Sequence, residues 1–478
     1  MTAIELEGAR AGNPPSVGLK LYFAAWRWHF YAGLFVIPFM AMLAVTGLII
    51  LWFTAVAPEY GDRLAVVPGA SVLSLPEQEA AALAAYPGAS VSQYIAPIDA
   101  AKPALFRVDA APGAQSGAQS GARMIALDPY RGTVLRDRAR GDTWNEFATD
   151  IHGTLLIGDT GDRLIEIAAG LGLVLVTTGL YLAWPRGPGG WARTLVPDLG
   201  ARGRALWKSL HGVIGFWMAL VLIFFLISGL AWAGIWGGKF VQAWSTFPAA
   251  KWDDVPLSDM SHAALNRGAE KSVPWAIEQT PMPASGSGAG VAGVAEGAPV
   301  DLAAVVALGR TLGFAGRFQV AAPQGETGVW TLSQDSMSYD SPDPTADRTV
   351  HVDRYSGRVL ASVGFADYSL PGKAMAVGIA LHEGQMGAWN IALNLAFAGS
   401  ILFIALSGAV MWWKRRPEGG LRLAAPPLPE AVPMWKGAVL IALLLAMAFP
   451  LLGLTILAVL AIDLLVLANL PALRRILN

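Results

Sequence analysis

Four of the six histidines occupy one recurring position in the sequence, and imidazole is a common ligand of transition metals and of haem iron. Each of the four precedes a long apolar run that ends at a hydroxyl residue followed by glycine. The four units are His29 with Thr46-Gly47, His152 with Thr178-Gly179, His211 with Ser228-Gly229, and His382 with Ser407-Gly408. The hydroxyl residue follows the histidine by 17, 26, 17 and 25 residues. This alternation predicts a duplicated unit with two apolar spans in each copy.

The positions of the four histidines predict two pairs at two depths in a membrane. His29 and His211 begin spans that run one way, and His152 and His382 begin spans that run back. Seventeen residues of helix rise about 25 Å, so most of the bilayer separates the two depths. A pseudo-two-fold axis along the membrane normal would bring each matched pair face to face. Two facing imidazoles are the axial ligands of a low-spin b-type haem, so we expect two haem b groups whose iron is bound by these histidines.

Other chemistry at the histidines has less support. Two ligands at each depth leave zinc or copper under-coordinated, and Glu383 is the only adjacent carboxylate. The hydroxyl of each Thr/Ser-Gly pair is expected to bond a carbonyl one turn back and to serve helix packing. The two remaining histidines, His262 and His351, are expected at surface or strand positions without partners. Three arginines near the two depths are candidate partners of haem propionates, with interfacial anchoring as the alternative: Arg27, Arg163 and Arg186.

Composition and charge place the chain among integral membrane proteins. Its 478 residues are 54% hydrophobic and 14% charged, with a mean hydropathy of +0.47. The absence of cysteine excludes disulfides, iron–sulfur clusters, thiolate ligation of haem and covalent c-type haem. The net charge of −1 gives no indication of a nucleic-acid partner, so membrane lipid is the expected surrounding.

The apolar runs predict a mainly α membrane protein built from duplicated two-helix units. Four core transmembrane helices are expected at 21–57, 151–185, 209–236 and 381–413. The last apolar stretch, 434–470, is too long for one ordinary span and contains Pro450 and Gly453. We expect a C-terminal transmembrane hairpin there, with one long kinked helix as the alternative.

Two long polar stretches, 58–150 and 237–380, are each expected to fold as an α+β domain. A helix from Ser74 to Tyr86 and four short strands are predicted in the first stretch. Both stretches contain the turn sequence Asp-x-Tyr-x-Gly-x-Val-Leu, which begins at Asp128 in the first and at Asp353 in the second. The shared turn predicts that the two domains are duplicates as well.

The short loops determine the expected orientation. Lysine and arginine are concentrated in 186–208, in 414–433 and in the C-terminal segment 471–478. Such short basic loops stay in the cytoplasm, together with residues 1–20. In a Gram-negative cell the two α+β domains would then face the periplasm, and the chain would be a multi-pass protein of the inner membrane.

The histidine units resemble those of the PepSY-associated transmembrane family. The resemblance rests on His…Thr-Gly-Leu, on the openings Leu210-His211-Gly212 and Leu381-His382-Glu383-Gly384, and on the sequence Trp412-Trp413-Lys414-Arg415-Arg416. The two α+β domains are similar to PepSY domains, so the resemblance covers residues 20–416. Family members include iron-regulated inner-membrane ferric-siderophore reductases, which carry two haems and pass electrons to iron in the periplasm.

The resemblance implies a haem-dependent ferric-siderophore reductase that releases Fe(II), with His29 and His211 holding one haem and His152 and His382 the other. The sequence has no flavodoxin-like or flavin reductase domain and no Gly-rich dinucleotide motif, so the expected donor is a separate quinol, reduced flavin or cytoplasmic flavoprotein. No catalytic residue is assigned. Four aromatic residues are candidates for the chelate pocket, with sheet packing as the simpler explanation: Tyr130, Trp144, Trp330 and Tyr355.

Two other functions remain open from the sequence. The chain could be a transmembrane haem subunit that feeds a separate periplasmic reductase, or a haem-free PepSY membrane protein with a binding or regulatory role. A transporter has the least support because few charges lie within the apolar runs, Asp463 being the main one. Neither the identity of the siderophore nor the oligomeric state is indicated.

Overall fold

The chain divides into two compact units, one helical and one built around a β-sheet. The computed structural model describes residues 17–110, 121–266, 273–416, 423, 425–426, 436–462, 465 and 469–470. The first unit comprises Met1–Gly47, His152–Phe240 and Leu395–Asn478, and the second comprises Leu48–Ile151 and Val241–Asn394.

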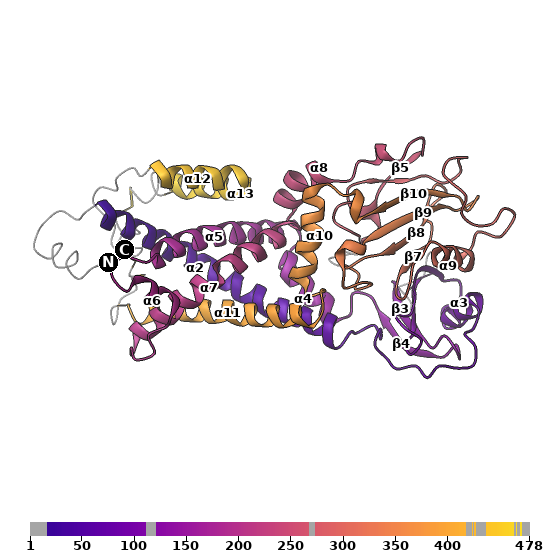
Figure 1. Ribbon diagram of the computed structural model, residues 1–478, viewed down its shortest axis with the longest axis horizontal. Helices are drawn as coiled ribbons and strands as arrows, with labels where there is room; N and C mark the ends of the chain where they lie inside the picture. Colours follow the sequence, from indigo (N-terminus) through magenta and orange to yellow (C-terminus); the bar gives the residue numbers. More distant parts are fainter. Residues whose placement is uncertain are drawn as a thin grey trace, which may run out of the picture. The chain divides into compact units, whose positions relative to one another are not determined.

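Four long helices run alongside one another in Figure 1. They are α2 (Val17–Leu51), which continues as a π-helical segment (Trp52–Val56), α5 (Asp159–Ala183), α7 (Arg204–Leu230) and α11 (Ala388–Trp413). Within the described residues, these four are the helices long and apolar enough to cross a membrane. A helix of 25 residues, the length of α5, extends about 38 Å and exceeds the roughly 30 Å of a hydrocarbon core.

Shorter helices lie between the long ones along the chain. They are α4 (Trp144–Thr154), α6 (Gly190–Leu195), α8 (Gln242–Ser245) and α10 (Leu370–Glu383). The expected span 151–185 is interrupted between α4 and α5, where Leu155, Leu156 and Gly158 have positive φ. The expected span 381–413 is interrupted in the same way between α10 and α11, where Gly384 and Gly387 have positive φ. His152 and His382 therefore lie on the short helices α4 and α10, whereas His29 and His211 lie within α2 and α7.

Small and aromatic side chains allow the long helices to pack closely in the first unit. A Cβ atom at Gly172 on α5 would lie 3.2 Å from Leu226 of α7, so glycine permits this approach. Phe225 of α7 stacks on Phe397 of α11 with ring centroids 4.0 Å apart. Ala44 of α2 belongs to the same buried cluster as Phe397, so α2, α7 and α11 share one core.

The expected C-terminal transmembrane hairpin is wrong. The stretch 434–470 contains two described helices, α12 (Lys436–Ala448) and α13 (Pro450–Ile462), of 13 residues each. A helix of this length rises about 20 Å, too little to cross the hydrocarbon core. Leu452 of α13 is buried against Gly170 of α5, and the indole of Trp236 donates a 2.9 Å hydrogen bond to the Ala448 carbonyl. The pair therefore packs against the bundle.

An eight-stranded antiparallel sheet dominates the second unit, with the order β10-β9-β8-β7-β1-β2-β3-β4 (Figure 1). Its strands are β1 (Ser90–Ile95), β2 (Ala104–Asp109), β3 (Arg123–Leu127), β4 (Val134–Ala139), β7 (Gln319–Ala321), β8 (Val329–Gln334), β9 (Arg348–Asp353) and β10 (Val359–Gly364). A separate pair is formed by β5 (Leu257–Ser261) and β6 (Pro281–Pro283).

The sheet overturns the expected mainly α fold with two separate α+β domains. Strands β1–β4 come from the first polar stretch and β7–β10 from the second, and β1 pairs with β7 so that Tyr94 lies opposite Val320. Each four-stranded half would otherwise expose β1 or β7 as an edge strand with unpaired backbone groups. Pairing the two edges satisfies these groups, so the two stretches form one α+β body.

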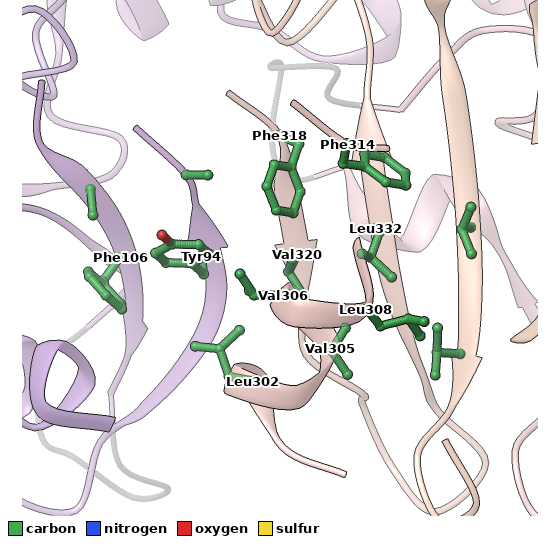
Figure 2. Packing of buried hydrophobic residues seen from close by; sticks show 14 of the residues in the cluster. Tyr94, Phe106, Leu302, Val305, Val306, Leu308, Phe314, Phe318, Val320 and Leu332 are labelled. Carbon is green, nitrogen blue, oxygen red and sulfur yellow. The ribbon is translucent and has the colours of Figure 1, made fainter. Parts of the chain in front are cut away.

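One hydrophobic core extends under both halves of this sheet. The helices α3 (Leu75–Leu83) and α9 (Leu302–Thr311) contribute to the same buried cluster as the strands. Figure 2 shows Tyr94 and Phe106 from the first half beside Val320 and Leu332 from the second, with α9 residues between them. The two halves therefore share their buried apolar side chains.

Local sequence predictions in this unit are confirmed. Ser74 caps α3, and its backbone N–H donates to Glu77 in the expected capping box. Asp128 and Asp353 each accept an N–H from the tyrosine two residues later, at 2.8 Å in both turns. These bonds hold the two copies of the turn, which lie between β3 and β4 and between β9 and β10.

Candidate haem-ligand site

His29 on α2 and His211 on α7 lie beside each other in the helical unit. Their ring centroids are 6.4 Å apart and the ring planes are nearly perpendicular, at 88°. Imidazole nitrogens bind transition-metal ions at about 2.0–2.1 Å, so two imidazoles on opposite sides of one ion have centroids roughly 6 Å apart. The observed separation fits this arrangement, and the two residues therefore fit a haem iron between them.

A hydroxyl residue on a neighbouring helix holds each of these histidines. Nδ1 of His29 is 3.0 Å from Oγ1 of Thr178 on α5, and Nδ1 of His211 is 2.9 Å from Oγ of Ser407 on α11. Both hydroxyls belong to the repeated Thr/Ser-Gly pairs. The sequence pattern contained the signal for this role, because the hydroxyl recurs with the histidine, but the partner lies on a different helix.

Hydrogen-bond donors and acceptors fix the tautomer of the two rings. The hydroxyl of Thr178 donates to the Val174 carbonyl at 2.7 Å, and that of Ser407 donates to the Ile404 carbonyl at 3.0 Å. This is the back-bond expected from the sequence, and it commits the hydroxyl hydrogen, so the oxygen accepts from Nδ1–H of the histidine. Nε2 is then the unprotonated nitrogen, and it is the one able to bind a metal ion.

The glycine after each hydroxyl makes room for the imidazole. A Cβ atom at Gly179 would lie 3.1 Å from Cε1 of His29, and one at Gly408 would lie 3.7 Å from Cε1 of His211. The closer approach at Gly179 leaves little space for a side chain. The Thr/Ser-Gly pair thus supplies an acceptor for Nδ1 and a flat surface for the ring edge.

His152 is held in the same way, although it lies on the short helix α4. Its Nδ1 is 2.8 Å from Oγ1 of Thr46 on α2, and Thr46 donates to the Met42 carbonyl at 2.8 Å. A Cβ atom at Gly47 would lie 3.6 Å from Cε1 of His152. Three of the four repeated histidines therefore have the same surroundings.

The fourth histidine, His382, lies on α10 in the second unit. Asn394 donates hydrogen bonds to the carbonyls of Leu381 and His382 at 3.2 and 2.8 Å, which fastens the end of α10 to the start of α11. Gly384 ends α10 in the left-handed conformation.

The three arginines predicted as propionate partners have protein partners. Arg27 donates to the Pro426 carbonyl and lies 5.0 Å from the ring centroid of Tyr31. Arg163 forms an ion pair with Asp162 and approaches Glu166 at 3.9 Å. Arg186 donates to the Tyr181 carbonyl at 2.7 Å, at the C-terminal end of α5. These contacts account for the three side chains, and a propionate role for them stays a prediction.

The expectation that His262 and His351 lack partners is wrong. Both are fully buried in the sheet unit, and their Nε2 atoms are 2.8 Å apart. Nδ1 of His262 donates to the Thr280 carbonyl at 2.7 Å, and Nδ1 of His351 accepts from Thr331 at 3.1 Å. Burial lowers the pKa of His262 to about 4, and burial together with His262 lowers that of His351 well below its usual value. The pair is therefore neutral and structural.

The aromatic residues suggested for a chelate pocket do not gather at one place. Tyr130 and Tyr355 lie in the two equivalent turns, beside β4 and β10 at opposite edges of the sheet. Trp330 packs against the core of the sheet, and Trp144 begins α4 with its ring edge-on to Phe147. Among the described residues, no group of three or more His, Asp or Glu side chains is placed so that it could hold a metal ion.

Comparison with known proteins places the chain in a family. The family model described as PepSY-associated TM region matches residues 26–415. The chain belongs to this family. The match includes all four repeated histidines, the helices α5, α7 and α11, and α2 from residue 26 on, so this PepSY-associated TM protein is a membrane protein. No curated protein matches it.

Proposed function

We propose that the chain is a di-haem oxidoreductase of the bacterial inner membrane that passes electrons from a cytoplasmic or quinol donor to a ferric siderophore in the periplasm. One observation carries the proposal: His29 and His211, from two membrane-spanning helices, have ring centroids 6.4 Å apart. Each ring keeps only Nε2 for a metal ion, because a hydroxyl accepts Nδ1–H. This arrangement supports axial ligation of one haem iron.

His29 and His211 would hold one haem b, and the sequence repeat assigns the second to His152 and His382. Bound haem b supplies a one-electron Fe(III)/Fe(II) couple. The chain's own residues fix the tautomer and orientation of the imidazoles, since each hydroxyl oxygen holds Nδ1–H and each glycine admits the ring edge. Such bonds to the outer nitrogen of a ligating histidine also increase its basicity.

Iron chemistry and the resemblance to ferric-siderophore reductases support the proposed acceptor. Ferric siderophores bind Fe(III) through hard oxygen ligands, which hold Fe(II) far less tightly. Transfer of one electron would therefore release the metal. The basic short loops support a periplasmic position for the long polar stretches, where such a chelate would arrive.

The test is the visible spectrum and pyridine haemochromogen content of the purified full-length protein. We expect about two b haems per chain, with about one lost in His211→Ala and about one in His382→Ala. Glu383→Gln is the matched control and should retain both. Protein that is folded but binds no haem would overturn the proposal and favour a haem-free binding role.

A second measurement tests the acceptor. Mixing chemically reduced protein with a ferric siderophore should oxidise the haem and produce Fe(II), which a ferrous-specific chelator detects. Haem that stays reduced would contradict direct reduction and would identify the chain as an electron-transfer subunit for another reductase.

A further inference from the structure

Two arginines near the His29–His211 pair have buried nitrogens without a hydrogen-bond partner in the described part of the chain. They are Nε and Nη2 of Arg415, just beyond the end of α11, and Nε of Arg204, at the start of α7. A buried polar group without a partner costs about 1–3 kcal/mol, and more when the group is charged. Native proteins rarely leave such donors unused, so their position indicates a missing acceptor.

Two aromatic rings of α2 lie beside the Arg415 guanidinium. Its Cζ lies 5.2 Å from the ring centroid of Trp26 and 4.8 Å from that of Phe30, on α2. These two residues flank His29 on the same helix. Ring stacking fixes the plane of a guanidinium while leaving its N–H groups available for another ligand.

The two arginines also form a concentration of positive charge. Burial, together with repulsion by Arg204, lowers the pKa of Arg415 from its usual value. Neither arginine takes part in the ion pairs found among the described residues. Two guanidinium groups that repel each other and have unused donors are suited to an oxyanion, which a guanidinium can bind through two parallel hydrogen bonds.

The distance to the histidines fits a ligand that reaches both places. Arg204 precedes His211 by seven residues on α7, which is two helical turns or about 10 Å. Arg415 stands seven residues after Gly408, whose Cβ position is 3.7 Å from His211. Both cations therefore lie within about two turns of the rings proposed to bind iron.

We infer that Arg204 and Arg415 form an oxyanion site, and that its ligand is a propionate carboxylate of the haem held between His29 and His211. The inference rests on the proposed function. A lipid headgroup phosphate offers the same chemistry, and the test separates the two sources. Sequence reasoning missed this pair because the arginines are 211 residues apart and only the fold brings them to one place.

The test compares haem with its dimethyl ester, in which both propionates are neutral. Full-length protein from haem-depleted cells is titrated with each ligand, and the Soret band gives the dissociation constants. We expect the wild type to bind haem at least about tenfold more tightly than the ester. Arg415→Gln and Arg204→Gln should weaken haem binding about tenfold and leave ester binding unchanged.

Two further variants control for charge and folding. Arg202→Gln removes an exposed cation two residues from Arg204 and should bind both ligands like the wild type. Arg415→Lys keeps the charge without the forked geometry and should bind haem with intermediate affinity.

Three outcomes would overturn the inference. The first is equal affinity of the wild type for haem and for the ester. The second is a loss of affinity in the glutamine variants that is the same for haem and for the ester. The third outcome is loss of phosphatidylglycerol from the purified glutamine variants with unchanged preference for haem over its ester, which would identify a lipid phosphate as the anion. Absence of a Soret band with either ligand would instead overturn the proposed function.

Discussion

Hydroxyl groups beside three of the histidines accept the imidazole N–H, which would otherwise lack a hydrogen-bond partner inside a membrane. A neutral ring has one N–H donor, and hydrocarbon offers no water to accept it. Thr178, Thr46 and Ser407 each donate to a carbonyl on their own helix and accept from a histidine on another. One small side chain therefore satisfies the ring, selects its tautomer and links two helices.

Replacing one hydroxyl tests whether it positions a metal ligand. Thr178→Val keeps the shape but removes the acceptor for Nδ1–H of His29, so the imidazole becomes a weaker donor to iron. Under the proposed function, the reduction potential of one haem should rise by roughly 20–60 mV, because about 60 mV corresponds to 1.4 kcal/mol for one electron. Spectroelectrochemical titration of the purified protein measures this shift.

Conservative and neighbouring variants distinguish positioning from packing. Thr178→Ser retains the hydroxyl and should restore the wild-type potential. Thr177→Val removes the adjacent hydroxyl, which donates to the Leu173 carbonyl of its own helix, and should leave both potentials unchanged. Equal shifts in Thr177→Val and Thr178→Val would contradict a specific role for Thr178.

The sequence predicted the residues of this site better than their partners. The spacing of the histidines was sufficient to predict that His29 and His211 lie together, because a duplicated pattern implies equivalent depths. The structure places their rings side by side. The pairing of Thr178 with His29 depends on how α2 and α5 face each other, which apolar runs do not encode. The neutral pair of His262 and His351 was missed for a similar reason. The two residues are 89 positions apart in the sequence, and only the folded chain brings their Nε2 atoms together.

At the scale of elements, the loop between β8 and β9 buries three carboxyl groups. Burial raises the pKa of Asp335 to about 6, and burial with the charge of Asp335 raises that of Asp347 to about 8. Burial also raises the pKa of Asp340, although Arg317 bonds it at 3.0 Å. Arg317 bonds Asp62 as well, at 2.9 Å, so this loop is tied to the first polar stretch.

These carboxyl groups make the stability of the sheet unit depend on pH. An aspartate has a pKa of about 4 in the unfolded chain, so between pH 4 and 8 folded Asp347 keeps a proton that the unfolded chain releases. The free energy of unfolding therefore falls as the pH rises through this window, by up to about 1.4 kcal/mol per pH unit for one proton. The stabilisation is fully present only below the unfolded pKa.

Asp347→Asn should reduce this dependence, because it keeps an acceptor for the Ser336 N–H and has no proton to lose. The thermal midpoint of the full-length variant, followed by tryptophan fluorescence, should be higher than that of the wild type at pH 8 and similar at pH 5. Asp343→Asn changes an exposed carboxylate in the same loop and should leave the pH dependence as it is. If the thermal midpoint of Asp347→Asn fell with rising pH as steeply as that of the wild type, Asp347 would not be the source of the pH dependence.

At the scale of the whole chain, the two copies of the duplicated stretch are joined into one sheet, which the sequence pattern did not indicate. The repeat was visible in the turns at Asp128 and Asp353, and each half forms its own four-stranded series. Two α+β domains were expected because both stretches contain the same turn sequence. What joins them is backbone pairing between β1 and β7, which requires no particular side chains and leaves no mark in either stretch. At the C-terminus the sequence indicated the break at Pro450, where α13 begins, but α12 and α13 have only 13 residues each, too few to cross a membrane.

Because a single core lies under both halves of the sheet, a destabilising substitution in one half should also destabilise the other half. Phe106 on β2 is fully buried in the cluster that also contains Val320, Leu332 and Val352. Phe106→Ala removes a large side chain from this core and should lower the free energy of unfolding by about 3–5 kcal/mol. Because the two halves share this core, hydrogen exchange in full-length protein should lose protection in β8 and β9 as well as in β2 and β3. Val134→Ala, at a half-exposed position of β4, should leave the hydrogen-exchange protection of both halves unchanged.

Loss of protection confined to residues 48–151 would mean that the two halves fold independently despite the β1–β7 pairing. The larger the loss of protection in β8 and β9, the stronger the coupling between the two halves across that pair.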